Sequence, residues 1–188
     1  MNSSVILPIV IAIAVIAVVA AIAFFLSRRR TSGRLRSRFG PEYERTLEET
    51  GDRREAEAEL RDRQKRVSRF EIRPLAPSDR DRFVVAWRAI QAEFVDAPKT
   101  ALAKGDDLLT EVMRARGYPV EDFEQRAADL SVDHPTVVQN YRAGRDIAHL
   151  HQQGRADTED LRQAMIHYRA LFDELVGDVA GGAERRAS

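Results

Sequence analysis

The chain has 188 residues, no cysteine, and 30 basic and 30 acidic residues. The missing cysteines exclude disulfides, a thiolate nucleophile and a lipid anchor on cysteine. Six of the thirty basic residues lie in 28–38, so 24 basic and all 30 acidic residues follow from Phe39 onward, a net charge of −6. This acidic portion is long enough for one domain with its own core, and its charge argues against nucleic-acid binding.

An uncharged run at Val5–Leu26 comes first along the chain. As an α-helix its 22 residues would extend roughly 33 Å, close to the ~30 Å hydrocarbon core of a bilayer. Pro8 lies in the first turn, where its missing N–H removes no helical hydrogen bond. The run predicts a transmembrane helix over residues 5–27, preceded by a short external N-terminus at 1–4.

A cleaved signal peptide is the main alternative for this run. Such a peptide has a basic start, an apolar core of roughly 7–15 residues and a small-residue cleavage site. Residues 1–4 carry no basic side chain, the apolar run is longer, and arginines follow it. The pattern therefore favours a retained anchor.

A basic juxtamembrane segment over residues 28–38 follows the run and contains no acid. Its basic residues are Arg28, Arg29, Arg30, Arg34, Arg36 and Arg38. The positive-inside rule places such a segment in the cytoplasm, with the N-terminus outside. These arginines can also attract anionic lipid headgroups, with about 1 kcal/mol for each.

Three small residues, Ala14, Ala17 and Ala21, share one face of the predicted span. This spacing allows two transmembrane helices to approach closely. Alternatively, these alanines simply face lipid. Self-association of the chain into a homo-oligomer stays open.

A charged segment over residues 39–73 predicts a solvated helical stalk that is partly packed on the following domain. Seventeen of the 28 residues in 42–69 are charged, and pairs such as Glu59–Arg63 stand four apart with the acid first, the favourable order on a helix. Gly51 and Asp52 suit a C-terminal cap and a new N-terminal cap, so the stalk is expected to break there. A coiled coil is an alternative, although its apolar stripe is narrow.

Residues 74–178 predict a compact bundle of about five helices, making the fold class all-α. Helix starts are expected near Ser78, Pro98, Glu121, Pro135 and Thr158. The last helix has the clearest amphipathic pattern, with apolar residues three and four apart. Short loops favour antiparallel neighbours, and residues 179–188 are expected to form a disordered tail.

No catalytic motif occurs in the sequence. There is no Gly-rich phosphate loop, nucleophile elbow or dinucleotide fingerprint. His149 and His151 stand two apart, on different sides of a helix, and Asp146–His149 alone is a weak metal pair. We therefore expect no enzyme activity, no cofactor and no metal site.

The segment 116–135 is the densest in polar and aromatic residues. Tyr118, Arg126, Asp129 and His134 are candidates for a recognition surface there. The structural alternative is a set of helix caps with an Arg126–carboxylate pair, and that interpretation is favoured.

Four runs resemble a family of uncharacterised bacterial single-pass membrane-anchored helical proteins. They are Arg38–Arg45, Glu49–Arg54, Arg116–Pro119 and Asp122–Pro135. The resemblance covers about 34–176 and implies a bacterial source and an inner or plasma membrane location. It implies no activity and no site residues.

These features together predict a membrane-tethered cytoplasmic interaction or scaffold module. Its expected partners are the lipid bilayer and one or more proteins, with no nucleic acid. An enzyme or small-ligand sensor that uses the 116–135 segment is the alternative function.

Overall fold

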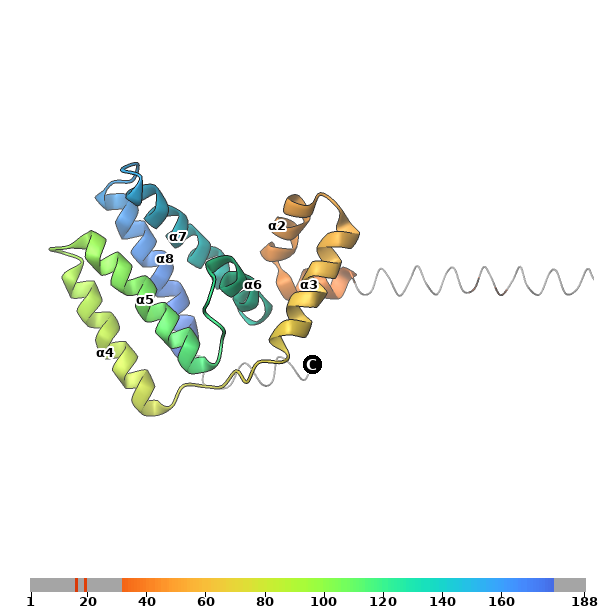
Figure 1. Cartoon of the computed structure of the whole chain (residues 1–188), viewed down its shortest axis with the longest axis horizontal. Coiled ribbons are helices and arrows are strands. Elements are labelled where there is room, and N and C mark those ends of the chain that lie inside the picture. The colour runs from red at the N-terminus through yellow and green to blue at the C-terminus, as the bar shows by residue number, and fades with distance from the viewer. Residues whose placement is uncertain (1–15, 17–18, 20–31, 178–188) are drawn as a thin grey trace, which may run out of the picture. The chain divides into compact units, whose positions relative to one another are not determined.

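The computed structural model describes Ile16, Val19 and residues 32–177, and every element in this part of the chain is helical (Figure 1). The chain divides into two compact units, residues 1–38 and 39–188. The all-α prediction is confirmed for the described residues.

The first unit contributes a short helical stretch at residues 32–38, together with Ile16 and Val19. Ser32 and Gly33 are part of that stretch. In the described residues, no helix combines the length and the apolarity needed to cross a bilayer. The transmembrane helix predicted over 5–27 lies outside the described residues except at Ile16 and Val19, so it stays a prediction.

A helical hairpin opens the second unit. Helix α2 spans Pro41–Thr50 and α3 spans Arg53–Val67. Gly51 ends α2 in the left-handed conformation at φ 69°, and the Asp52 side chain accepts hydrogen bonds from the amides of Arg54 and Glu55. The break predicted at Gly51–Asp52 is confirmed, with each residue in the capping role expected of it.

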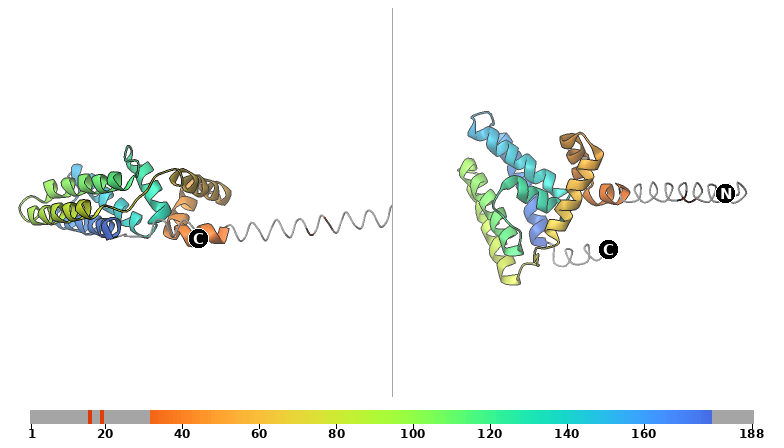
Figure 2. Two further views of the ribbon diagram at one scale, coloured as in Figure 1. Left: turned by 90° about the horizontal axis from the view of Figure 1, so that it is seen from below. Right: turned by 45° about the vertical axis from the view of Figure 1, so that its right-hand side comes forward.

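This hairpin occupies the residues predicted to form a solvated stalk. Tyr43, Ala56, Leu60 and Val67 are buried, and α3 packs along α6 of the bundle. All three ribbon views place the hairpin at the α6 end (Figure 2). The narrow apolar stripe of the charged segment is therefore covered within the chain, and the segment packs on the bundle more closely than a mainly solvated stalk would.

Five helices follow the hairpin. They are α4 (Pro77–Glu93), α5 (Pro98–Arg116), α6 (Phe123–Asp133), α7 (Val137–Gln152) and α8 (Thr158–Gly177). With α2, α3 and the stretch at 32–38, the described residues form eight helical segments rather than five. The five helices α4–α8 occupy the residues predicted for the bundle, and the three additional segments are α2, α3 and the stretch at 32–38.

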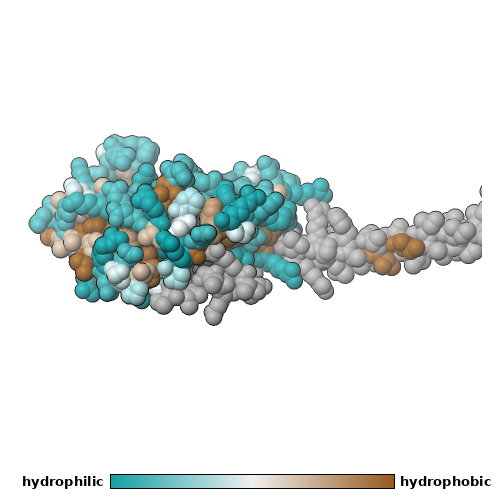
Figure 3. Space-filling view, turned by 60° about the horizontal axis from the view of Figure 1, so that its bottom comes forward, coloured by the Kyte–Doolittle hydropathy of each residue, from teal (hydrophilic) through white to brown (hydrophobic). Residues whose placement is uncertain are grey.

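Helix α8 is central to the bundle core. Helices α5 and α7 both pack along it, and α4 packs mainly on α5. The Trp87 ring of α4 stacks on the Phe172 ring of α8 with centroids 4.8 Å apart. Exposed hydrophobic side chains are scattered between hydrophilic ones in the space-filling view (Figure 3). The apolar face predicted for α8 is thus the centre of the core.

Tyr168 of α8 is held between two glycines. An added Cβ at Gly144 of α7 would lie 2.5 Å from the Tyr168 ring, and one at Gly105 of α5 would lie 3.6 Å from it. Glycine inside a helix costs about 1 kcal/mol relative to alanine. At Gly144 the missing side chain makes room for the tyrosine ring.

The helix ends agree with the sequence in most places. Pro98 begins α5, and Gly117 follows its last residue at φ 93°. Asp157 and Asp160 cap α8 reciprocally, each side chain accepting the other's amide hydrogen. Helix α4 differs, since it begins at Pro77 after Ala76 and has no side-chain cap at Ser78.

Candidate functional site

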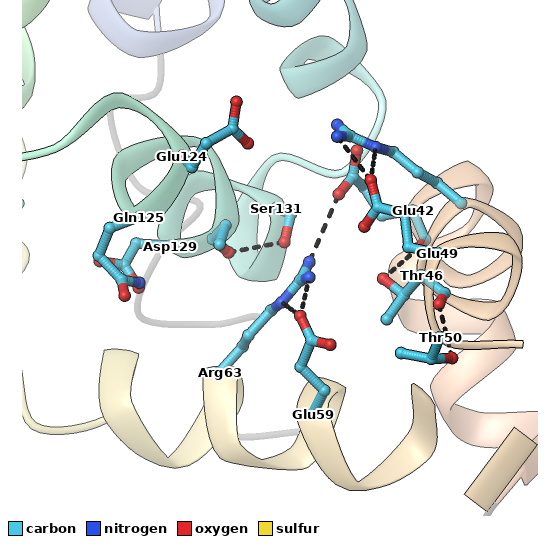
Figure 4. A network of polar contacts seen from close by, with 12 residues as sticks. Glu42, Thr46, Glu49, Thr50, Glu59, Arg63, Glu124, Gln125, Asp129 and Ser131 are labelled. Carbon is cyan, nitrogen blue, oxygen red and sulfur yellow. Dashed lines mark hydrogen bonds and ion pairs between the residues drawn. The ribbon is translucent and has the colours of Figure 1, made fainter. Parts of the chain in front are cut away.

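The contact between hairpin and bundle is centred on Glu42. This residue lies in the first turn of α2 and is fully buried. One carboxylate oxygen lies 3.5 Å from Nη1 of Arg63 in α3 (Figure 4), and the other lies 3.5 Å from Nε of Arg142 in α7. A single buried acid therefore joins two guanidinium groups from different helices.

Each of these arginines also has a more exposed acidic partner. Arg63 donates from Nε to Glu59 at 3.1 Å, and Arg142 donates from Nη1 to Glu124 of α6 at 2.7 Å. The side chains of Glu59 and Glu124 are 43 % and 70 % exposed. The i,i+4 pair predicted between Glu59 and Arg63 is confirmed. It supplements a buried contact that the helical spacing does not predict.

A second ion pair joins the hairpin to α6. Arg66 of α3 donates from Nε to Oδ1 of Asp129 at 2.8 Å. Asp129 is 1 % exposed, and burial raises the pKa of its carboxyl group although Arg66 acts to lower it. The guanidinium of Arg66 therefore bonds across the interface to a carboxylate in the bundle.

A cavity of about 360 Å³ adjoins these pairs. Among its lining residues are Arg45, Glu49, Glu59, Asp62, Arg63, Arg66, Asp122, Glu124, Gln125 and Arg142. The four arginines and the five acids nearly balance in charge. Such a lining suits water and small polar groups.

The four residues predicted as a recognition surface are all buried in the structure. Tyr118 donates its hydroxyl to Asp133 at 3.1 Å, and Nδ1 of His134 lies 3.0 Å from Glu174 in α8. Arg126 donates to the hydroxyl of Thr110 in α5. Each side chain contacts a different partner, so these residues do not converge on one exposed surface.

Their contacts match the structural interpretation, with one correction. Asp122 caps α6 by accepting the amide hydrogen of Gln125 at 3.0 Å, as helix-cap chemistry predicts. The partner of Arg126 is the Thr110 hydroxyl rather than a carboxylate. The carboxylate that bonds an arginine is Asp129, whose partner Arg66 lies 63 residues earlier in the chain.

Burial also determines the electrostatics of His134. Desolvation lowers its pKa, while the hydrogen bond with Glu174 acts in the opposite direction. The neutral imidazole is therefore favoured inside the fold.

A second polar cluster lies between α5, α7 and α8. Arg145 of α7 donates from Nη1 to Asp106 of α5 at 3.0 Å. Burial raises the pKa of Asp106, and it also raises the pKa values of the nearby Tyr141 and Tyr168 phenols. A groove of about 530 Å³ runs alongside, with Asp106, Arg145 and His151 among its lining residues.

The basic juxtamembrane residues are only partly described. Arg34 and Arg36 are exposed and Arg38 is half-buried, while Arg28, Arg29 and Arg30 lie outside the described residues. Residues 32–177 and the two isolated positions contain no group of three or more acidic or histidine side chains placed to hold a metal ion.

Comparisons with protein-family models, with curated proteins and with solved structures gave no match. The resemblance to bacterial membrane-anchored proteins therefore stays a prediction.

Glu42 and Arg142 are the site residues that sequence reasoning missed. Glu42 stands among many other acids in the charged segment, and Arg142 lies on a helix with a polar outer face. The runs containing Glu42 and Asp129 carry the family resemblance, but nothing in their spacing pairs them with residues of other helices.

Proposed function

We propose that this protein is a membrane-tethered interaction module, with its helical domain held at the cytoplasmic face of a bacterial membrane. The observation that carries the proposal is the junction of an uncharged 22-residue run with a six-arginine segment. An apolar run of that length matches the bilayer core, and the arginines favour a cytoplasmic location for the domain on their C-terminal side.

The helical domain is consistent with an interaction role. Its charged hairpin and bundle meet through ion pairs, and hydrophilic residues cover much of the face seen in Figure 3. Protein partners that recognise such a surface would be selected mainly by charge complementarity, which affects specificity and association rate more than affinity.

Single-cysteine labelling tests the topology directly, because the natural chain has no cysteine. Ser3→Cys and Gln139→Cys place one thiol before the predicted span and one on the exposed surface of α7. In intact cells, a membrane-impermeant maleimide is expected to label the first thiol alone. Both are expected to react after permeabilisation.

Other labelling patterns would contradict parts of this proposal. Labelling of Gln139→Cys in intact cells would place the domain outside the cell. Release of the chain from membranes by alkaline carbonate would show that residues 5–27 do not anchor it in the bilayer. Charge reversal of Arg28, Arg29 and Arg30 should weaken the orientation preference. The same reversal at Arg53, Arg54 and Arg61, far from the run, is the matched control.

A small-ligand sensor is the second candidate, and the groove beside Asp106 favours it. Its volume of about 530 Å³ falls in the range of small-molecule sites, and it combines apolar walls with an ion pair between half-buried Asp106 and more exposed Arg145. The cavity of about 360 Å³ next to α6 is a second place for such a ligand, and it borders the 116–135 segment. Fragment binding that Arg145→Met abolishes and Arg155→Met leaves intact would support the groove.

A further inference from the structure

We infer that the α2–α3 hairpin is a detachable element, docked on α6 and α7 by ion pairs and able to open while the bundle stays folded. Opening would uncover Asp129 and Arg142, the bundle residues whose charges the hairpin neutralises. That a protein partner binds the uncovered surface rests on the proposed function, whereas the opening of the hairpin does not depend on it.

The first support is the separation of the apolar cores. The core cluster of the bundle is built from residues of α4–α8 and the α5–α6 connection, and it includes no residue of the hairpin. Phe39, Tyr43, Leu60 and Val67 are buried apart from that cluster. Undocking the hairpin would therefore leave the bundle core, including the Trp87–Phe172 stack, intact.

The second support is that ion pairs connect the hairpin to the bundle, beside the apolar stripe of α3 that packs along α6. Two ion pairs cross the interface, Glu42 with Arg142 and Arg66 with Asp129, while Glu42 also pairs with Arg63 inside the hairpin. Among the described residues of α4–α8, Val132 is the one buried apolar side chain outside the bundle core. Buried ion pairs roughly offset their own desolvation, so they determine orientation more than they add stability.

The third support is the connection between hairpin and bundle. From Glu71 onward the chain is attached to the bundle, since the amide of Arg73 donates to the carbonyl oxygen of Arg116 at 2.9 Å. Ile72 and Leu75 also pack against the bundle core. The turn at 68–70 lies between this attached segment and α3, and Ser68 and Arg69 are exposed there. A pivot at 68–70 would move the hairpin without disturbing the bundle.

Glu42 is the residue on which docking should depend most. Replacing it with glutamine keeps the shape but leaves Arg63 and Arg142 facing a neutral amide. Two buried guanidinium groups then lose their shared counter-charge, which favours the open state where both can be hydrated. Glu49→Gln is the matched control, because Glu49 pairs with Arg45 within α2 and is half exposed.

Distance measurement by electron paramagnetic resonance tests the inference in the full chain, in detergent micelles. Spin labels at Ala58→Cys in α3 and Gln139→Cys in α7 report on docking, since both positions are exposed. A pair at Ala89→Cys and Gln139→Cys reports on the bundle alone. We expect Glu42→Gln to increase the long-distance population of the first pair at least tenfold and to leave the second pair unchanged.

If Glu42→Gln leaves the distance distribution of the Ala58–Gln139 label pair unchanged, the inference is overturned. The inference is also overturned if the distance distribution of the Ala89–Gln139 pair broadens together with that of the first pair, because hairpin and bundle would then unfold as one unit. Glu49→Gln is expected to resemble the natural chain in both pairs.

Hydrogen exchange of the unaltered chain keeps the inference testable if Glu42→Gln does not fold. Helices of this length are marginal in water once they lose their tertiary contacts, so the undocked hairpin should lose helical hydrogen bonds while the bundle keeps its own. Amides in the middle of α3 should therefore exchange at least tenfold faster than those of α5 and α8. Equal protection in α3 and α8 would overturn the inference. Neither measurement depends on membrane orientation or on a partner, so failure here is distinguishable from failure of the proposed function.

Discussion

Nη1 of Arg116, the last residue of α5, donates a hydrogen bond to the carbonyl oxygen of Leu175 at 2.9 Å. Leu175 lies in the last turn of α8, where carbonyl groups have no partner within the helix. The positive guanidinium also complements the negative end of the α8 dipole. One buried arginine thus joins the C-terminal ends of two helices.

Replacing Arg116 with methionine should destabilise the domain. The change removes a charged hydrogen-bond donor from a buried carbonyl, at a cost of about 2 kcal/mol. Unfolding by urea, followed through the fluorescence of Trp87, measures the difference, since Trp87 is the only tryptophan and lies in the core. Arg114→Met is the control, because Arg114 is exposed and a surface change alters stability by less than about 0.5 kcal/mol. Equal effects of both variants would contradict the role of Arg116.

The two glycines beside Tyr168 should respond oppositely to alanine. At Gly144 the new methyl group would lie 2.5 Å from a fully buried ring, and overpacking of this kind should cost about 2 kcal/mol. At Gly105 the nearest atoms lie at 3.6 Å or more, so better helix propensity should add about 0.5–1 kcal/mol of stability. Thermal melting of both variants checks the prediction, which fails if the two shifts have the same sign.

Gly117 should tolerate substitution less well than Gly154. Both have positive φ, at 93° and 69°, so alanine is strained at either position. An added Cβ at Gly117 would also lie 2.5 Å from the carbonyl oxygen of Glu71, whereas Gly154 has open space. We expect a loss of about 1 kcal/mol for Gly154→Ala and about 3 kcal/mol for Gly117→Ala, measured by urea unfolding. Similar losses would show that the Glu71 segment moves aside.

His134 should make the fold sensitive to mild acid. Its pKa is lowered in the folded state, so the unfolded chain binds a proton more readily between that pKa and the ordinary value near 6.5. Stability from the neutral imidazole is therefore present above about pH 6.5 and is lost as the pH falls toward the folded pKa. His134→Gln should reduce the difference in unfolding free energy between about pH 7.5 and about pH 5.5. An unchanged difference would exclude His134 as its source.

Sequence patterns locate the helices of the bundle well because their ends depend on nearby residues. Pro98, Gly117 and Asp157 act through the backbone of their own helix ends. The apolar face of α8 likewise follows from helical spacing alone, and it forms the centre of the core. Such local interactions survive any change in the surroundings of the helix.

The charged segment packs on the bundle more closely than its sequence predicts, for the opposite reason. Its density of acids and bases predicts a solvated stalk, yet Glu42 and Arg63 are buried. Burial of either requires a partner elsewhere, and Arg142 stands a hundred residues after Glu42 in the chain. For the segment 116–135 the favoured structural interpretation agrees with the contacts, since the polar groups of Tyr118 and His134 bond to Asp133 and Glu174 inside the fold.

The sequence by itself determined the all-α class, the capped ends of most helices and the proposal of an anchor beside a basic segment. Each rests on composition or on spacing within a few residues. Three features are visible only in the tertiary structure. Glu42 forms ion pairs with both Arg63 and Arg142, Asp129 forms an ion pair with Arg66, and the hairpin packs on α6. The reason is physical: a charged side chain can be buried only where distant parts of the chain bring it a counter-charge.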